Sequence, residues 1–254
     1  MKDFISYPAL DAFTNCINAT SLKMQDKPLL FSQALHTGQD PKIITQNRKA
    51  FLDTLEIGKD FKIVLANQTH SDHIAIIDTY ENRGWEELES AIPDTDALIT
   101  NKKEILLGIL SADCLPILLF DPKKEVIAAI HAGWAGTHKR IAPKTVLKMA
   151  EHFGSNPKDI IAQFAPCIAP CCYEVGEEFQ EQFKEYKEAL IEHHDTCYLD
   201  IPLVNNLQLQ EVGLLKENIH QSGICTACEN ERFFSYRKEG GCSGRMLTFI
   251  GMKS

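Results

Sequence analysis

The sequence predicts a mixed α/β fold in which strands and helices form a single domain over residues 1–254. Compact apolar runs alternate with amphipathic stretches of helical period, and two long apolar runs flank a turn sequence near the middle of the chain. A chain of 254 residues is long enough for one large core. The loose alternation and the hairpin signals differ from the regular pattern of a parallel βαβ array.

The composition argues against several classes of partner. The formal net charge of -9 disfavours binding to nucleic acid or to an anionic membrane surface. No stretch approaches the roughly 20 consecutive apolar residues of a membrane span. The N-terminus, MKDFISYPALDAF, has neither a basic start nor a continuous apolar segment, so we expect a cytoplasmic protein. We expect its nine cysteines to stay reduced there.

The first hundred residues are expected to supply a helix and two buried strands. Apolar side chains at near-helical spacing predict a helix over residues 42–56. Periodicity alone makes Arg48 on this helix a solvated surface charge. Apolar runs predict strands at 61–66 and 96–100, and the polar, acidic segment 80–95 between them predicts a loop or a short surface helix.

The second half of the chain is expected to add three helices, one strand and a terminal hairpin. Apolar spacing predicts helices at 142–153, 177–192 and 202–219, a strand at 160–164 and a hairpin of 232–237 with 245–250. This hairpin either brings arginines to a pocket or forms an edge pair with solvated charges.

A β-hairpin over residues 104–137 is the strongest local signal in the sequence. Its two apolar runs flank Asp121-Pro122-Lys123-Lys124, in which Asp and Pro occupy the first two positions of a type I turn. With Pro122 and Lys123 as the two turn residues, Cys114 would lie directly opposite His131. Residues opposed in this way have Cβ atoms about 4.5 to 5.5 Å apart, so a thiol and an imidazole would meet.

His70 follows the end of the predicted strand at 61–66, a usual place for site residues. Together, His70, Cys114 and His131 form a three-ligand zinc set with an open fourth position, as in catalytic zinc sites. Zinc bound there would make hydroxide available near neutral pH and keep the thiol deprotonated. The same residues also fit a nucleophilic pair, with Cys114 as nucleophile and either histidine as base. A third interpretation is a core thiol with two polar histidines.

The remaining cysteines give weaker signals. Cys167, Cys171 and Cys172 lie close together, but two adjacent cysteines do not easily bind one ion in relaxed geometry, which favours packed free thiols. Cys225 and Cys228 form a single CxxC without a clear second pair, whereas structural zinc usually needs four ligands.

Several segments match the motifs of a known family, in order: NQTHSDHIAII, DTDALIT, SADCLPILLFDP, IHAGWAGT, APCIAPCCYEVG and ICTACENERFFSYRKEGGCSGRM. From about residue 44 onward the chain resembles the laccase-domain family, once called multicopper polyphenol oxidases and now purine nucleoside phosphorylases. The resemblance implies mixed β-sheets sandwiched between helices. It also implies zinc ligation by His70, Cys114 and His131. Ser71 stands where members of the family commonly have glycine.

The activity implied by the resemblance is enzymatic. It consists of phosphorolysis of adenosine, inosine, guanosine and methylthioadenosine, and hydrolytic deamination of adenosine. Purine nucleosides and phosphate would then be the partners of a monomeric enzyme. The Asn-Arg motif of the family aligns with Asn47-Arg48, which makes Arg48 a candidate phosphate or substrate contact. Arg245, in the Gly-Arg-Met motif, is a second candidate.

Three alternative functions stay open. Relatives are also associated with peptidoglycan editing, which would be amide hydrolysis at the same zinc or thiol. The older family name suggests a copper-dependent polyphenol oxidase, and Cu²⁺ could occupy the zinc site because copper binds most N/S sites more tightly. The sequence lacks the His-x-His pairs and the soft axial ligand expected for an oxidase. A non-catalytic binding protein would leave the Cys-His-His set unexplained.

Overall fold

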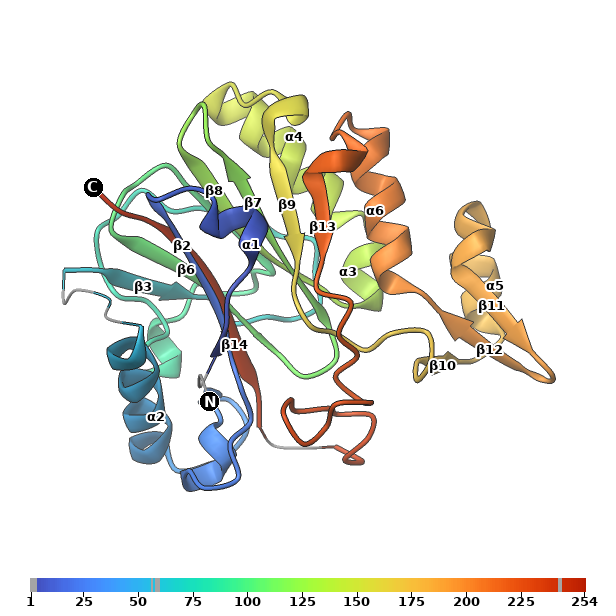
Figure 1. Ribbon diagram of the computed structural model, residues 1–254, viewed down its shortest axis with the longest axis horizontal. Helices are drawn as coiled ribbons and strands as arrows, with labels where there is room; N and C mark the ends of the chain where they lie inside the picture. The colour runs from blue at the N-terminus through green and yellow to red at the C-terminus, as the bar shows by residue number, and fades with distance from the viewer. Residues whose placement is uncertain (1–3, 56, 58–59, 242–243) are drawn as a thin grey trace.

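The computed structural model describes residues 4–55, 57, 60–241 and 244–254. Two β-sheets pack face to face, and helices cover the outer side of each sheet (Figure 1). The predicted mixed α/β class is confirmed, as is the arrangement of mixed sheets between helices.

The first sheet has five strands and is antiparallel except at one edge. Only its last two strands pair in parallel. In spatial order the strands are β1 (Phe4–Ile5), β2 (Cys16–Ser21), β14 (Met246–Met252), β6 (Ile105–Ser111) and β3 (Lys62–Leu65).

The second sheet has six strands and contains the central hairpin. Both of its edge strands pair in parallel with their neighbours, and the interior pairs are antiparallel. In spatial order the strands are β13 (Ile219–Gln221), β9 (Ile161–Phe164), β7 (Leu115–Asp121), β8 (Val126–Ala132), β5 (Ala97–Thr100) and β4 (Ile74–Ile76). A separate antiparallel sheet comprises β10 (Glu174–Val175), β12 (Thr196–Leu199) and β11 (Leu190–His193).

The helices are short to medium in length. The α-helices are α1 (Pro8–Asp11), α2 (Pro41–Thr54), α3 (Trp134–His138), α4 (Ile141–Phe153), α5 (Glu178–Gln182) and α6 (Ile201–Glu211). The 3₁₀ helices are η1 (Pro28–Phe31), η2 (Leu88–Ser90), η3 (Pro157–Asp159), η4 (Lys184–Ala189) and η5 (Lys216–Asn218). Within the described part of the chain, no helix is long and apolar enough to cross a membrane.

Alternation along the central strands builds three cores. In β6, Leu107 and Ile109 face the second sheet, whereas Leu106 and Leu110 face the other way, towards the side of α2. In β7, Leu118 and Phe120 face the first sheet. Ile117 and Leu119, on the other face of the strand, pack in one core with residues of α4 and α6. Both sheets therefore bury both faces, which is why their central strands read as continuous apolar runs.

The central hairpin has a longer loop than the sequence analysis predicts. Asp121 pairs with Val126, and the Asp121 Oδ1 atom accepts backbone N–H bonds from Lys123 and Lys124 at 2.9 and 3.1 Å. This Asx-type loop holds four residues instead of two and shifts the register. His131 pairs with Pro116, so the predicted opposition of His131 and Cys114 on one ladder is wrong.

Two predicted helices and the terminal hairpin also need correction. The helix predicted at 177–192 is replaced by α5, η4 and β11, because the chain leaves helical geometry at Phe183 and Tyr186 so that both rings reach the core. The helix predicted at 202–219 ends at Glu211. Residues 232–237 form turns beside β14, whose two edges are already occupied by β2 and β6.

The packing of the two sheets predicts that Phe120→Ala greatly lowers the stability of the protein. Phe120 is fully buried between the sheets, and its ring meets that of Phe13 at a centroid distance of 5.3 Å. We expect the free energy of unfolding to fall by about 3 to 5 kcal/mol, from lost transfer energy plus the cavity. Urea unfolding followed by circular dichroism would measure it. The control Leu147→Ala changes an exposed side chain and should stay within about 0.5 kcal/mol. A similar loss in both variants would contradict the assignment.

Candidate functional site

Three predicted ligands converge where the two sheets meet at one end. His70 lies in the loop after β3, Cys114 lies directly before β7, and His131 lies near the end of β8. Their potential ligand atoms all lie within 4.8 Å of one another, and the Cys114 Sγ and His70 Nε2 atoms are 3.8 Å apart. His131 lies on the same face of β8 as Ile127 and Ala129, and this face is directed towards the first sheet. The structure thus unites these three residues despite the shifted register.

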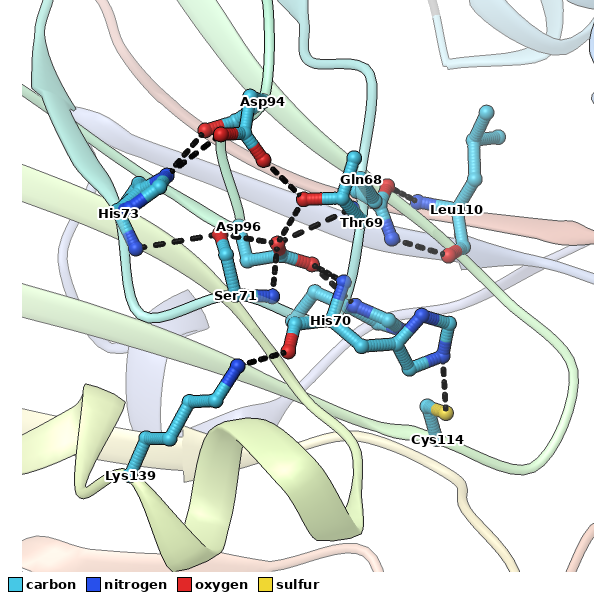
Figure 2. Close-up of polar contacts among 11 residues, drawn as sticks. Gln68, Thr69, His70, Ser71, His73, Asp94, Asp96, Leu110, Cys114 and Lys139 are labelled. Carbon is cyan, nitrogen blue, oxygen red and sulfur yellow. Dashed lines mark hydrogen bonds and ion pairs between the residues drawn. The ribbon is translucent and has the colours of Figure 1, made fainter.

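A fully buried carboxylate, Asp96, fixes the site (Figure 2). Its Oδ1 atom lies 2.8 Å from His131 Nδ1, so that the imidazole directs Nε2 towards the thiol. The Asp96 Oδ2 atom accepts bonds from the Ser71 N–H and hydroxyl groups, each at 2.7 Å. The His70 N–H group donates to Asp96 Oδ1 at 3.1 Å. One carboxylate therefore positions both histidines, one through its ring and the other through its backbone.

The loop that carries His70 is anchored on both sides. The Gln68 side chain continues the backbone pairing of β6, because it donates to the Leu110 carbonyl at 2.8 Å and accepts from the Leu110 N–H group at 2.9 Å. The Lys139 ammonium group donates to the His70 carbonyl at 3.2 Å. These contacts hold His70 in left-handed backbone geometry, with a φ of 60°.

Gly133 leaves room for the three side chains. A Cβ atom at this position would lie 2.9 Å from Cys114 Sγ and 3.2 Å from His70 Cδ2. The glycine after the histidine and alanine of the HAGW motif is therefore a steric requirement of the site, since a Cβ atom there would displace the Cys114 thiol and crowd the His70 ring.

Cys114 and His131 form a charged pair. Burial by itself raises the pKa of Cys114, but the charge and hydrogen bond of His131, together with His70, lower it to about 6. Burial likewise lowers the pKa of His131, but the Cys114 thiolate and the Asp96 hydrogen bond raise it to about 9. Asp96 itself has a pKa held well below its usual range, despite burial, by His131 and Ser71. The thiolate is thus available at neutral pH for a metal or an electrophile.

The donor set fits a metal ion. Two imidazoles and a low-pKa thiolate are ligands that zinc and copper accept, and three protein ligands leave a coordination position open. The carboxylate behind His131 is the partner that metal-binding imidazoles normally have. The same geometry also fits a Cys-His nucleophilic pair.

The three side chains open into a cavity of about 460 Å³. Its other walls combine aromatic rings with cations. Arg237 lies over the Tyr173 ring at 5.4 Å, and Arg245 lies over the Tyr236 ring at 5.9 Å. The cavity has the size and the mix of apolar and polar groups of a small-molecule site.

Arg48 is buried, so its interpretation as a solvated surface charge is wrong. Its guanidinium group donates to the backbone carbonyls of Gln33 at 2.9 Å and Gly84 at 2.8 Å, and also to that of Trp85. These bonds join α2 to two loops. Arg48 is not among the described residues that line the cavity, whereas Arg245 is.

Several residues of the site were not predicted from the sequence. Asp96 appeared only as the start of a predicted strand, although a carboxylate beside a buried strand, in an Asp-x-Asp motif, was a usable signal. Tyr173 and Arg237 lie far from the histidines in sequence, and only the tertiary fold brings them to the cavity.

Comparison with known proteins places the chain in a family. Residues 27–253 match a family model described as multi-copper polyphenol oxidoreductase laccase. A purine nucleoside phosphorylase YlmD from Bacillus subtilis is 34% identical over 225 residues, which cover 86% of this chain and 81% of that protein. An adenosine deaminase RL5 from an unknown prokaryotic organism is 35% identical over 207 residues, covering 78% of this chain and 79% of the relative.

The fold is also found in solved structures. The crystal structure of the Bacillus licheniformis hypothetical protein YfiH has a TM-score of 0.92 and 29% sequence identity, and the match covers 100% of this chain and 97% of that one. The family match spans most of the chain and includes all three converging residues. The chain therefore belongs to the multi-copper polyphenol oxidoreductase laccase family.

Proposed function

We propose that this protein is a zinc-dependent purine nucleoside phosphorylase that also deaminates adenosine. The observation that carries the proposal is the convergence of His70, Cys114 and His131 at a cavity lined by arginines and aromatic rings. Names of relatives support it, since they include both a purine nucleoside phosphorylase and an adenosine deaminase. The proposed substrates are adenosine, inosine, guanosine and methylthioadenosine, with phosphate.

His70, Cys114 and His131 would hold the metal, and Asp96 would keep the His131 tautomer that presents Nε2. A bound zinc ion would supply Lewis acidity and would lower the pKa of a coordinated water towards neutrality. The protein positions the reactants through the rigid ends of β3, β7 and β8. Cu²⁺ fits the same donors, but among the described residues that line the cavity Cys114 is the only sulfur ligand, and no methionine is present as the soft axial ligand of an oxidase-type copper site.

The cavity wall suits a nucleoside and an anion. Tyr173 and Tyr236 provide aromatic surface for a purine ring. Arg237 and Arg245 bring positive charge to the same wall, where they would orient phosphate for attack on the ribose C1 atom as the bond to the base breaks. His36 also lines this cavity, and its pKa is lowered to about 4 by burial and then by Arg245, Arg48 and His131. It is therefore neutral at pH 7 and adds no charge.

Arg48 has a supporting role in this proposal. Its Nε and Nη1 atoms donate to backbone carbonyls, and it is not among the described residues that line the cavity, so we assign it to the position of the Gln33–His36 wall. Arg245 and Arg237 line the cavity, and we assign anion binding to them. This replaces the direct substrate contact that the family motif implies for Arg48.

The proposal predicts phosphate-dependent base release that is strongly reduced by Cys114→Ala. With zinc-loaded protein and inosine, we expect hypoxanthine and ribose 1-phosphate only when phosphate is present. Cys114→Ala should reduce kcat/KM at least about a hundredfold, because metal stabilisation of transition-state charge is worth several kcal/mol. Chromatography of the released base would measure both. Cys197→Ala, a buried thiol in β12, serves as the control and should keep activity. Absence of turnover in the wild type would refute the proposal and favour amide hydrolysis.

Arg245→Gln should weaken the binding of phosphate more than the binding of the nucleoside. Loss of a charge-assisted contact of about 1.5 to 3 kcal/mol predicts a rise in the KM for phosphate of roughly tenfold or more. Steady-state kinetics with each substrate varied in turn would separate the two KM values. Arg232→Gln removes an arginine that pairs with Glu229 on the surface and should leave both unchanged. Equal KM changes for phosphate and nucleoside would argue against an anion site at Arg245.

The pKa of Cys114 predicts how metal controls its reactivity. Since this pKa is lowered to about 6, the metal-free thiol should react with iodoacetamide at a rate that is high above pH 6 and falls below it. Zinc should suppress the reaction. Peptide mass spectrometry would follow it, with Cys16 as the internal reference because burial raises its pKa to about 12. Equal reactivity with and without zinc would favour Cys114 as a nucleophile instead.

A further inference from the structure

A second group of sulfur ligands lies outside the site described above. The tertiary fold brings together Cys171 and Cys172 from one loop and Cys225 and Cys228 from another. A parallel bridge between Cys167 and Cys225 holds the two loops side by side, with the Thr226 N–H group donating to the Cys167 carbonyl at 3.0 Å. The two pairs, which are separate and weak signals in the sequence, therefore form one four-cysteine cluster.

The spacing of the sulfur atoms fits one tetrahedral ion. The Cys228 Sγ atom lies 3.5 Å from that of Cys171 and 3.4 Å from that of Cys172, and all four sulfur atoms lie within 4.8 Å of one another. Zinc–sulfur bonds of about 2.3 Å at tetrahedral angles place sulfur atoms about 3.8 Å apart. A disulfide needs about 2.05 Å, so the thiols are grouped but not bonded.

Local backbone geometry allows two adjacent cysteines to face the same point. The Cys172 and Tyr173 N–H groups both donate to the Ala169 carbonyl, at 2.9 and 3.0 Å, which folds this segment into a tight turn. The Ala169 N–H group points at the Cys225 Sγ atom at 3.4 Å, a contact that stabilises a thiolate. Cys225 is buried, whereas Cys171 and Cys228 are exposed, so an ion could enter from solvent.

We infer that Cys171, Cys172, Cys225 and Cys228 form a second metal site, a closed tetrathiolate site for a zinc ion. Four soft protein ligands without an open position are typical of structural zinc, in contrast to the three-ligand set of the first site. The four thiols lose their protons as the ion binds, so each ion taken up releases up to four protons at low pH.

The position of the cluster indicates what such an ion would hold in place. Tyr173 directly follows Cys172 and lines the cavity, as does Ile168 at the start of the same loop. From the other loop, the Thr226 hydroxyl donates to Asp113 Oδ1 at 2.6 Å, beside Cys114. The second ion would thus clamp two loops that form one wall of the cavity, which makes it a positioning element with no contact to substrate.

Metal stoichiometry tests the inference in the full chain. After removal of loosely bound metal, we expect two zinc ions per wild-type chain by elemental analysis and one in the Cys171→Ser/Cys228→Ser double variant. Cys197→Ser is the matched control and should keep two. Cys114→Ala should lose the other ion. If Cys114→Ala has no effect while the double variant still loses one ion, the second site stands and the proposed first site falls.

Two measurements on the wild-type protein avoid dependence on variants that fail to fold. Cobalt(II) added to metal-free protein should give the strong thiolate-to-metal absorption of a tetrahedral sulfur site. Zinc should protect the four cluster cysteines from alkylation at least tenfold, as mapped by peptide mass spectrometry. Equal alkylation with and without zinc, a disulfide among the four thiols, iron with acid-labile sulfide, or an unchanged zinc content in the double variant would each overturn the inference.

Discussion

The buried carboxylate of Asp96 is the constraint on which the site depends. A fully buried charge is stable only when it is fully hydrogen-bonded, and Asp96 meets that condition through the His131 imidazole and through the loop of residues 69–71. The pairing of β5 with β8 provides the frame, because the His131 N–H group also donates to the Asp96 carbonyl at 2.7 Å. The two histidines thus share a rigid reference point in the second sheet.

The sheets form a rigid frame, and the loops and strand ends at one edge of this frame carry the reactive side chains. The central strands of both sheets are buried on both faces, so the ends of β3, β7 and β8 have little freedom to move. Arg48 extends this support to the opposite wall, since its buried guanidinium ties α2 to the loops around Gln33 and Gly84. A cavity assembled on such a frame can hold ligands in one geometry without rearrangement.

The cysteines with potential metal-binding roles lie in two places, at Cys114 and in the four-cysteine cluster. Cys114 is half-buried, has a lowered pKa and faces two histidines, whereas the four-cysteine cluster has neither histidine nor carboxylate among the described residues that form it. The loop from Ile168 to Tyr173 connects the two places, because it carries members of the cluster and of the cavity wall. Other thiols, such as Cys16 and Cys197, are buried and isolated from both groups.

The sequence by itself determined the fold class, several central strands and the identity of the three converging residues. Apolar runs mark β5, β6, β7, β8 and β9 because both faces of these strands are buried, and a helix period marks α2 and α4. The three residues adjoin such apolar strands: His70 lies in the loop after β3, Cys114 directly before β7 and His131 near the end of β8.

Only the tertiary structure decided the register, the surroundings of the ligands and the grouping of the cysteines. The side chain of Asp121 selected a four-residue loop, which no count of apolar residues could reveal. The aromatic stripe at 177–192 breaks into short pieces because Phe183 and Tyr186 gain more from burial than from a continuous helix. Asp96, Arg237 and the four clustered cysteines acquire their partners across long separations in sequence, and such contacts arise from packing and leave no local period.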